Sequence, residues 1–128
     1  VHLWAASSAS DTDFVARLTD VFPDGRSINL TDGIVRARYR NAAQGEAPSL
    51  IEPGQPYLYI IDLWATSNVF KAGHCIRLQI TSSSFPRWDR NPNTGHALGA
   101  DAELAVAQQT ILHDSEHPSF VLLPLVAG

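Results

Sequence analysis

The fold is decided by the stretch FVARLTDVFPDG, residues 14–25. In an extended strand it places Phe14, Ala16 and Leu18 on one face and Arg17 and Thr19 on the other. Pro-Asp-Gly at its end is a strong turn signal, because proline fits the corner of a type I or II turn and glycine accepts a positive φ. The stretch therefore predicts one strand of a β-hairpin, with the next strand returning after the turn.

The rest of the chain repeats this pattern of short β-rich runs bounded by turn residues. Further strands are predicted over residues 1–6, 28–39, 57–64, 74–81, 105–112 and 120–125. Gly33 predicts a bulge within its strand, and residues 41–56 a loop without an expected function. One turn of helix is compatible with residues 97–103, although Gly99 weakens it. Short strands without a long helix favour an all-β, two-sheet antiparallel sandwich or jelly roll.

Composition limits the classes of protein that fit. The 128 residues suit a single domain, with 45% hydrophobic and 17% charged residues. A net charge of −4 argues against a general nucleic-acid binder, and no apolar run approaches a membrane span. We expect no signal peptide at residues 1–4. Because the chain has no methionine, we expect it to be one domain, residues 1–128, of a longer protein.

Sites for chemistry are sparse in this sequence. Serine hydrolysis usually needs a strained G-x-S-x-G elbow, and none occurs. Cys75 is the single cysteine and lies among strand residues, which favours a buried, inert thiol. His113 and His117 have the spacing of a helical metal motif, but Pro118 favours a turn instead. We expect no catalytic residue, no metal and no cofactor in this chain.

Two carboxylates near the start of the chain leave two interpretations open. Asp11 and Asp13 could hold calcium, or they could cap turns and pair with Arg87 or Arg90 at a partly buried corner. The second interpretation is favoured, since a D-x-D pattern alone is weak evidence for a metal.

The loop over residues 82–95 combines two prolines and turn-forming asparagines with aromatic and charged side chains. A long loop of this composition is either fixed against another part of the protein or binds a ligand. Trp88 is the tryptophan best placed to contact a ligand or partner, whereas Trp4 and Trp64 are expected in a core or at a domain interface. The candidate site residues are Asp11, Asp13, Arg87, Trp88, Asp89, Arg90, Asn91 and Asn93.

An ordered set of motifs along nearly the whole chain resembles a known family. These motifs are residues 10–14, 23–26, 29–33 with Arg36, Arg38 and Tyr39, residues 53–54, 62–74, 85–95 and 113–119. In order and spacing they are similar to the C-terminal non-catalytic domain of the cocaine esterase and X-Pro dipeptidyl-peptidase family of serine hydrolases.

The resemblance implies a galactose-binding-like jelly roll that packs on an α/β-hydrolase domain, supports it and shapes its cleft. That partner domain would hold the Ser-His-Asp triad. Sugar binding does not follow from the fold label, and an autonomous carbohydrate- or calcium-binding module is the alternative. The resemblance also implies that one or more strands precede Val1. No nucleic-acid or membrane partner is expected; a homo-oligomer, the compartment and the substrate stay open.

Overall fold

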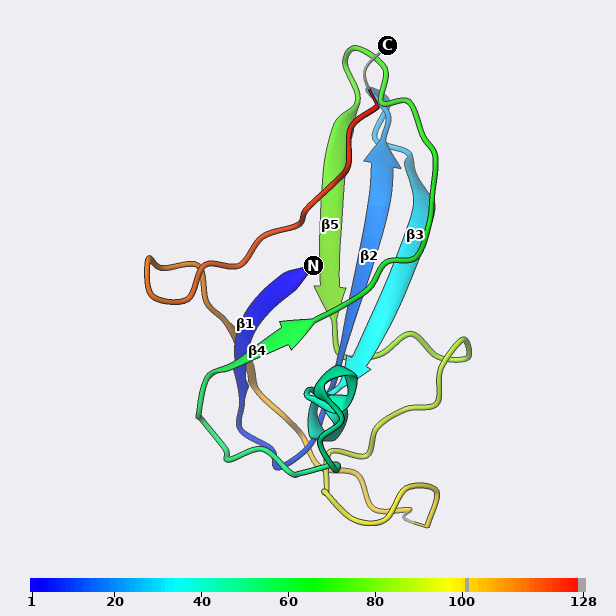
Figure 1. Cartoon of the computed structure of the whole chain (residues 1–128). Helices are drawn as coiled ribbons and strands as arrows, with labels where there is room; N and C mark the ends of the chain where they lie inside the picture. Colours follow the sequence, from blue (N-terminus) through cyan, green and yellow to red (C-terminus); the bar gives the residue numbers. More distant parts are fainter. Residues whose placement is uncertain (101, 127–128) are drawn as a thin grey trace.

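The computed structural model describes residues 1–100 and 102–126 and consists mainly of short strands (Figure 1). The strands are β1 (His2–Ser7), β2 (Asp13–Val21), β3 (Ser27–Arg36), β4 (Tyr57–Ile60), β5 (Cys75–Thr81) and β6 (Gln109–Ile111). Two 3₁₀ turns, η1 (Ala37–Tyr39) and η2 (Ala42–Gln44), follow β3. The strands form two antiparallel sheets, ordered β4-β1-β6 and β3-β2-β5. The predicted all-β sandwich of two antiparallel sheets is confirmed.

The predicted hairpin is present, but its bulge lies elsewhere than expected. Strands β2 and β3 pair with a register shift, so that Leu18 lies opposite Thr31 whereas Thr19 lies opposite Asn29. Leu30 is therefore the extra residue, and the bulge predicted at Gly33 is wrong. Gly33 is required for another reason: a Cβ there would overlap the carbonyl oxygen of Asp62, whose segment passes directly over it.

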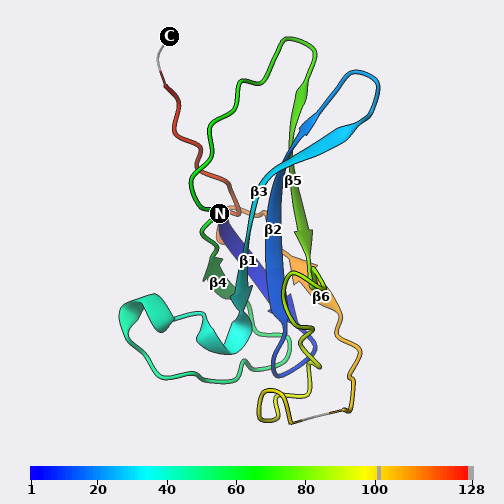
Figure 2. The same ribbon diagram turned by 90° about the vertical axis from the view of Figure 1, so that its right-hand side faces the viewer.

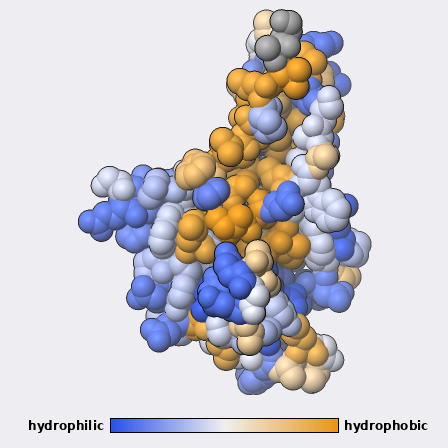
Figure 3. All heavy atoms as spheres, in the orientation of Figure 1, coloured by the Kyte–Doolittle hydropathy of each residue, from blue (hydrophilic) through white to orange (hydrophobic). Residues whose placement is uncertain are grey.

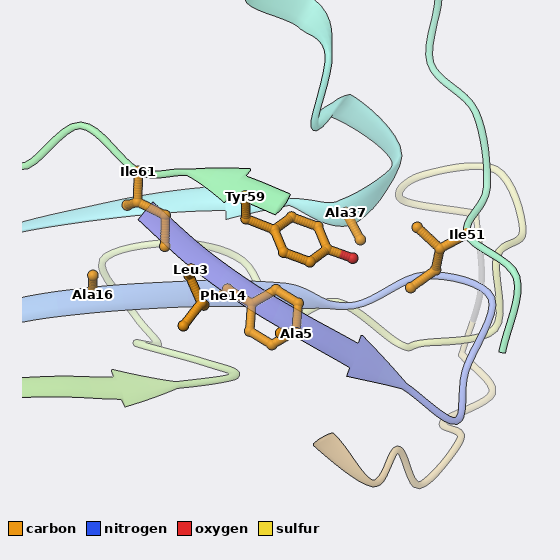
Figure 4. Packing of buried hydrophobic residues seen from close by; sticks show 8 residues of the cluster. All are labelled: Leu3, Ala5, Phe14, Ala16, Ala37, Ile51, Tyr59 and Ile61. Carbon is orange, nitrogen blue, oxygen red and sulfur yellow. The ribbon is translucent and has the colours of Figure 1, made fainter. Parts of the chain in front are cut away.

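The core lies between the two sheets and follows the predicted parity of β2 (Figure 4). Its buried members are Leu3, Ala5, Phe14, Ala16, Ala37, Ile51, Tyr59 and Ile61. The rings of Phe14 and Tyr59 lie 4.6 Å apart, centroid to centroid, in a tilted arrangement. The Tyr59 hydroxyl is buried without a hydrogen-bond partner among the described residues, and desolvation raises the pKa of Tyr59 well above its ordinary value.

Several predicted strands are shorter in the structure. The run at 57–64 ends at Ile60, and Trp64 has a φ of 64°, which no strand tolerates. The run at 105–112 is reduced to β6, and the run at 120–125 forms only a bridge between His2 and Phe120. Residues 98–100 form a turn around Gly99 rather than a helix; residue 101, also in that prediction, lies outside the described residues.

The two sheets differ in extent, which leaves part of one inner face without a facing sheet. The β2–β3 hairpin and the start of β5 reach beyond the β4-β1-β6 sheet (Figures 1 and 2). Irregular segments around residues 62–70 and 121–126 run along this region (Figure 1). Apolar side chains gather on the surface there (Figure 3).

Candidate functional site

The tripeptide Asp11-Thr12-Asp13, which joins β1 to β2, is buried although two of its members are carboxylates. Asp11 and Thr12 are 0% exposed and Asp13 is 1% exposed. A buried carboxylate is costly unless cations and hydrogen-bond donors surround it. The structure must therefore supply those donors from elsewhere in the chain.

Two arginines from the end of β3 and from η1 supply them. Arg38 donates from Nε to Oδ2 of Asp11 at 2.8 Å and from its main-chain N–H to Oδ1 at 3.0 Å. Arg36 donates from Nε and from a terminal nitrogen to the two oxygens of Asp13, at 2.8 and 3.0 Å. The hydrogen bond to Asp13 raises the pKa of Arg36, which favours the charged guanidinium in this pair.

Asn91 completes this arrangement from the distant loop. Its Nδ2 donates to Asp11 Oδ2 at 3.0 Å and to Asp13 Oδ1 at 2.9 Å. The five residues Asp11, Asp13, Arg36, Arg38 and Asn91 are called the charge cluster below. All four carboxylate oxygens in the cluster accept hydrogen bonds, two of them from two donors each. Because every carboxylate oxygen is hydrogen-bonded, the cluster fixes the backbone at residues 11–13 and in the loop that carries Asn91.

Further bonds hold the loop of residues 82–95 to the same corner. Asn91 Oδ1 accepts from the main-chain N–H of Asn93, and Asn93 Nδ2 donates to the carbonyl of Ala105 at 2.9 Å. Asn93 itself has a φ of 65°, which asparagine tolerates better than most residues. The interpretation of this loop as fixed against the domain thus agrees with its contacts.

The predicted ion pairs of Asp11 and Asp13 are wrong, because other arginines lie closer to both carboxylates. Arg87 pairs instead with Asp32 at 3.0 Å, and its guanidinium lies 4.8 Å from the centre of the Trp88 ring. Arg90 lies 5.6 Å from the centre of the Phe85 ring. Of the predicted corner, the structure brings together Asp11, Asp13 and Asn91. Arg87, Trp88, Asp89 and Arg90 form an adjacent, more exposed surface.

Sequence reasoning missed Arg36 and Arg38 as members of the cluster. The signal that could have found them is their alternation with the apolar residues Val35 and Ala37, which places both arginines on one face. Asp13 lies opposite Arg36 in the β2–β3 register only because the bulge shifts the pairing by one residue. A register counted from the turn without that bulge places Asp13 opposite Val35.

The other predicted residues give mixed outcomes. The prediction of a buried Cys75 is wrong: the thiol is exposed, because it shares the outward, polar parity of β5. Trp64 is 78% exposed and therefore not a core residue. Trp4 is half-buried, with its ring edge-on to His117 at 5.1 Å.

The histidine motif forms a turn, as predicted. Asp114 Oδ1 accepts from the main-chain N–H groups of Glu116 and His117 and lies 3.0 Å from Nδ1 of His117. Within the described ranges 1–100 and 102–126, no three His, Cys, Asp or Glu side chains are grouped as metal ligands would be. No helix in those ranges has the length and hydropathy that crossing a membrane requires.

An apolar groove of about 710 Å³ lies where the inner face of the β3-β2-β5 sheet has no facing sheet. Its floor includes Leu18, Leu30 and Ile76, and its walls are residues 62–66 and 122–125. Val1 and His2 form one end, so the N-terminus opens into it. We call this feature the N-terminal groove; Figure 3 shows the apolar surface around it.

The fold and this buried, saturated cluster define a β-sandwich domain whose loops are fixed by charge pairing. Residues 1–122 match the family model described as the X-Pro dipeptidyl-peptidase C-terminal non-catalytic domain. The chain belongs to this family, which confirms the resemblance drawn from its motifs.

Relatives of known structure or activity share this domain. Cocaine esterase of Rhodococcus sp. (strain MB1 Bresler) is 51% identical over 127 residues, 98% of this chain and 22% of the esterase. A solved α-amino acid ester hydrolase superposes with a TM-score of 0.79 at 30% identity, over 91% of this chain and 21% of that one. An aminopeptidase from a marine sediment archaeon, Thaumarchaeota archaeon, gives 0.77 at 32% identity, over 91% of this chain and 21% of that one.

The chain spans about a fifth of the length of these relatives. It is a non-catalytic C-terminal domain of the family that cocaine esterase and the X-Pro dipeptidyl-peptidases share, and a larger chain with a catalytic partner domain is implied. Nothing in these comparisons supports an autonomous sugar- or calcium-binding module.

Proposed function

We propose that the protein to which this domain belongs hydrolyses esters through a serine nucleophile in an α/β-hydrolase domain. The observation that carries this proposal is the 51% identity to cocaine esterase across almost the whole domain. The similarity to an α-amino acid ester hydrolase points to the same bond type. In such a reaction the serine attacks the ester carbonyl, a histidine takes its proton and backbone N–H groups hold the oxyanion.

The domain's own task in this proposal is to support the catalytic domain and to shape its cleft. The charge cluster holds the loop of residues 82–95 from within, while Phe85 remains 64% exposed and the Arg87 side chain 59% exposed on its outer side. An internally fixed loop with exposed aromatic and cationic side chains suits a pre-organised contact with another domain. Arg87, Trp88, Asp89 and Arg90 are the residues we assign to that contact.

Turnover by the full-length protein tests the activity. We expect it to hydrolyse an activated phenyl ester and to lose this activity on treatment with a serine-directed phosphonate. An X-Pro anilide should be cleaved far more slowly. If the anilide is cleaved faster than the ester, the proposed esterase activity is wrong and the protein is assigned as an X-Pro peptidase, the activity in the family's description.

A paired substitution tests the contact. In the full-length protein Trp88→Ala should raise KM or lower kcat for the ester, whereas Trp4→Ala, on the far side of β1 beside His117, should leave both unchanged. Unchanged kinetics in Trp88→Ala with normal folding would place the contact elsewhere on the domain.

A further inference from the structure

The N-terminus lies between two segments that are already hydrogen-bonded to it in strand geometry. On one side, the Val1 nitrogen donates to the Ile61 carbonyl at 2.7 Å and Ile61 N–H donates to the Val1 carbonyl at 2.9 Å. This pair extends the β1–β4 ladder by one step beyond His2 and Ile60. On the other side, His2 and Phe120 exchange both of their main-chain bonds at 2.9 Å.

Both registers are antiparallel, so they can be continued past the N-terminus by counting. A residue immediately before Val1 would lie opposite Asp62 on one side and Leu122 on the other. The residue before that would lie opposite Leu63 and Leu123, and the left-handed backbone of Trp64 ends the ladder on the first side. These are the residues that line the N-terminal groove, so the groove has the location and the walls of one further strand segment.

We propose that the N-terminal groove is filled by the segment that immediately precedes Val1 in the full-length protein, extending β1 as a strand between residues 62–63 and 122–123. The proposal rests on the proposed function in one respect: the chain is the C-terminal domain of a protein about five times longer, as its relatives are. The occupant is thus a defined piece of the same polypeptide.

Hydrogen bonding supports this occupant over an unrelated apolar ligand. Neither Leu63 N–H nor Leu122 N–H has a protein partner among residues 1–100 and 102–126. Both would point at carbonyls of the preceding strand, since main-chain bonds alternate sides along a strand. A strand in this position satisfies them, whereas a hydrocarbon surface would leave them unpaired.

The Val1 nitrogen supports it as well. Burial lowers the pKa of the Val1 amino group despite the nearby Asp62 carboxylate, because the groove disfavours the charged form. As a peptide nitrogen it would make the same bond to Ile61 without a charge.

The pleat also specifies the chemistry of the occupant. Leu3 and Ala5 are buried, at 2% and 0% exposed, and alternate residues of β1 share their face. The second residue before Val1 lies on that face, above the floor of the groove. We therefore expect an apolar side chain at that position, opposite Leu63 and Leu123 in the lining of the groove.

Engineered disulfide formation in the full-length protein tests the register. In a Cys75→Ser background, cysteine is introduced at the residue immediately before Val1 together with Asp62→Cys. These two positions form a non-hydrogen-bonded pair with Cα atoms roughly 4.5 Å apart, which suits a disulfide. The matched control combines the same upstream cysteine with Asn68→Cys, an exposed position in the same wall.

We expect mild oxidation to join the first pair in most molecules, seen as a linked peptide by mass spectrometry, and the control pair not at all. Free thiols in the first pair, or equal linkage in the control, would overturn the proposal. Ester turnover is measured on the same preparations. If the cross-link forms but the protein hydrolyses no ester, the proposed function is rejected while the proposed strand stands.

Amide exchange of the unmodified full-length protein gives a second readout that needs no substitution. Leu63 and Leu122 amides should exchange on the order of a hundredfold more slowly than free peptide amides. Fast exchange at both positions contradicts the strand. Protection that rises with protein concentration also contradicts it, since it would assign the groove to a second copy of the chain.

Discussion

Asn91 donates a hydrogen bond to Asp11 across 80 positions of sequence, at 3.0 Å, and the same nitrogen reaches Asp13 at 2.9 Å. A neutral amide thus lies between two buried carboxylates whose other partners are arginines. It contributes donors without adding charge, which leaves two acids and two guanidinium groups in balance.

Replacing this amide separates its donor role from its shape. Asn91→Ala should lower the free energy of unfolding by about 1.5–3 kcal/mol, because hydrogen bonds to charged groups are lost. Asn91→Asp should cost more, since it adds a third carboxylate of nearly the same size. Urea unfolding measures both, with exposed Asn68→Ala as the control. Equal stability of the Asp variant and the wild type would contradict the assigned role.

Two arginine–aspartate pairs of similar geometry differ in burial and should differ in their contribution. In Arg38–Asp11 the side chains are 12% and 0% exposed, and in Arg26–Asp24 they are 65% and 55% exposed. Arg38→Ala should cost about 3–5 kcal/mol by leaving a buried carboxylate unpaired. Arg26→Ala should cost much less, because solvent screens the exposed pair. Comparable losses in thermal or urea unfolding would show that burial is not the deciding factor.

Gly33 allows the segment at Asp62 to cross β3. Gly33→Ala places a Cβ against the Asp62 carbonyl, so the segment must move and the domain should lose more than about 2 kcal/mol. In Gly54→Ala the space around the new Cβ is empty, and only the φ of 83° is unfavourable, at about 1 kcal/mol. A smaller loss in Gly33→Ala than in Gly54→Ala would disprove the steric argument.

Tyr59 should make the domain sensitive to alkali. Burial raises its folded pKa above the value of about 10 in an unfolded chain, so the folded state binds this proton more tightly. Stability from this group is complete below pH 10 and is lost as the pH rises above it. Tyr59→Phe removes the unpaired hydroxyl, should be as stable as the wild type or more so at pH 7, and should lose less stability at pH 11.

Calcium should not bind at Asp11 and Asp13. Every oxygen of both carboxylates already accepts from arginine or asparagine, and a cation would have to displace those donors. Millimolar calcium should therefore leave the melting temperature and the tryptophan fluorescence unchanged. A saturable rise in melting temperature with calcium, but not with magnesium, would contradict this prediction and support a calcium site at Asp11 and Asp13.

The strands and sheets could be predicted because alternation and turn chemistry are local. The polarity of residues 14–25 predicts the inner face of β2, and Phe14 and Ala16 lie in the core as predicted, although Val15 and Thr19 on the other face are buried too. The ordered motifs along the chain identified the family for a similar reason, since each is a short local pattern.

The pairing within the cluster could not be predicted, because it depends on one extra residue. Leu30 shifts the register by one position and brings Arg36 opposite Asp13. A leucine at this position does not by itself predict a bulge. The exposure of Cys75, by contrast, follows from the polar parity of β5 and was open to prediction from the sequence. Unlike charges indicated that the corner is paired, but the choice of partner is a tertiary property.

The span of the charge cluster bears on how the domain folds during synthesis. Asp11 and Asp13 leave the ribosome first, their arginines follow within one hairpin, and Asn91 and its loop come much later. Until then, the hairpin carries two acids that still lack one of their donors. Folding should therefore become complete only when the second half of the chain has emerged, and a chain truncated before Asn91 should be a substrate for proteases rather than a smaller stable domain.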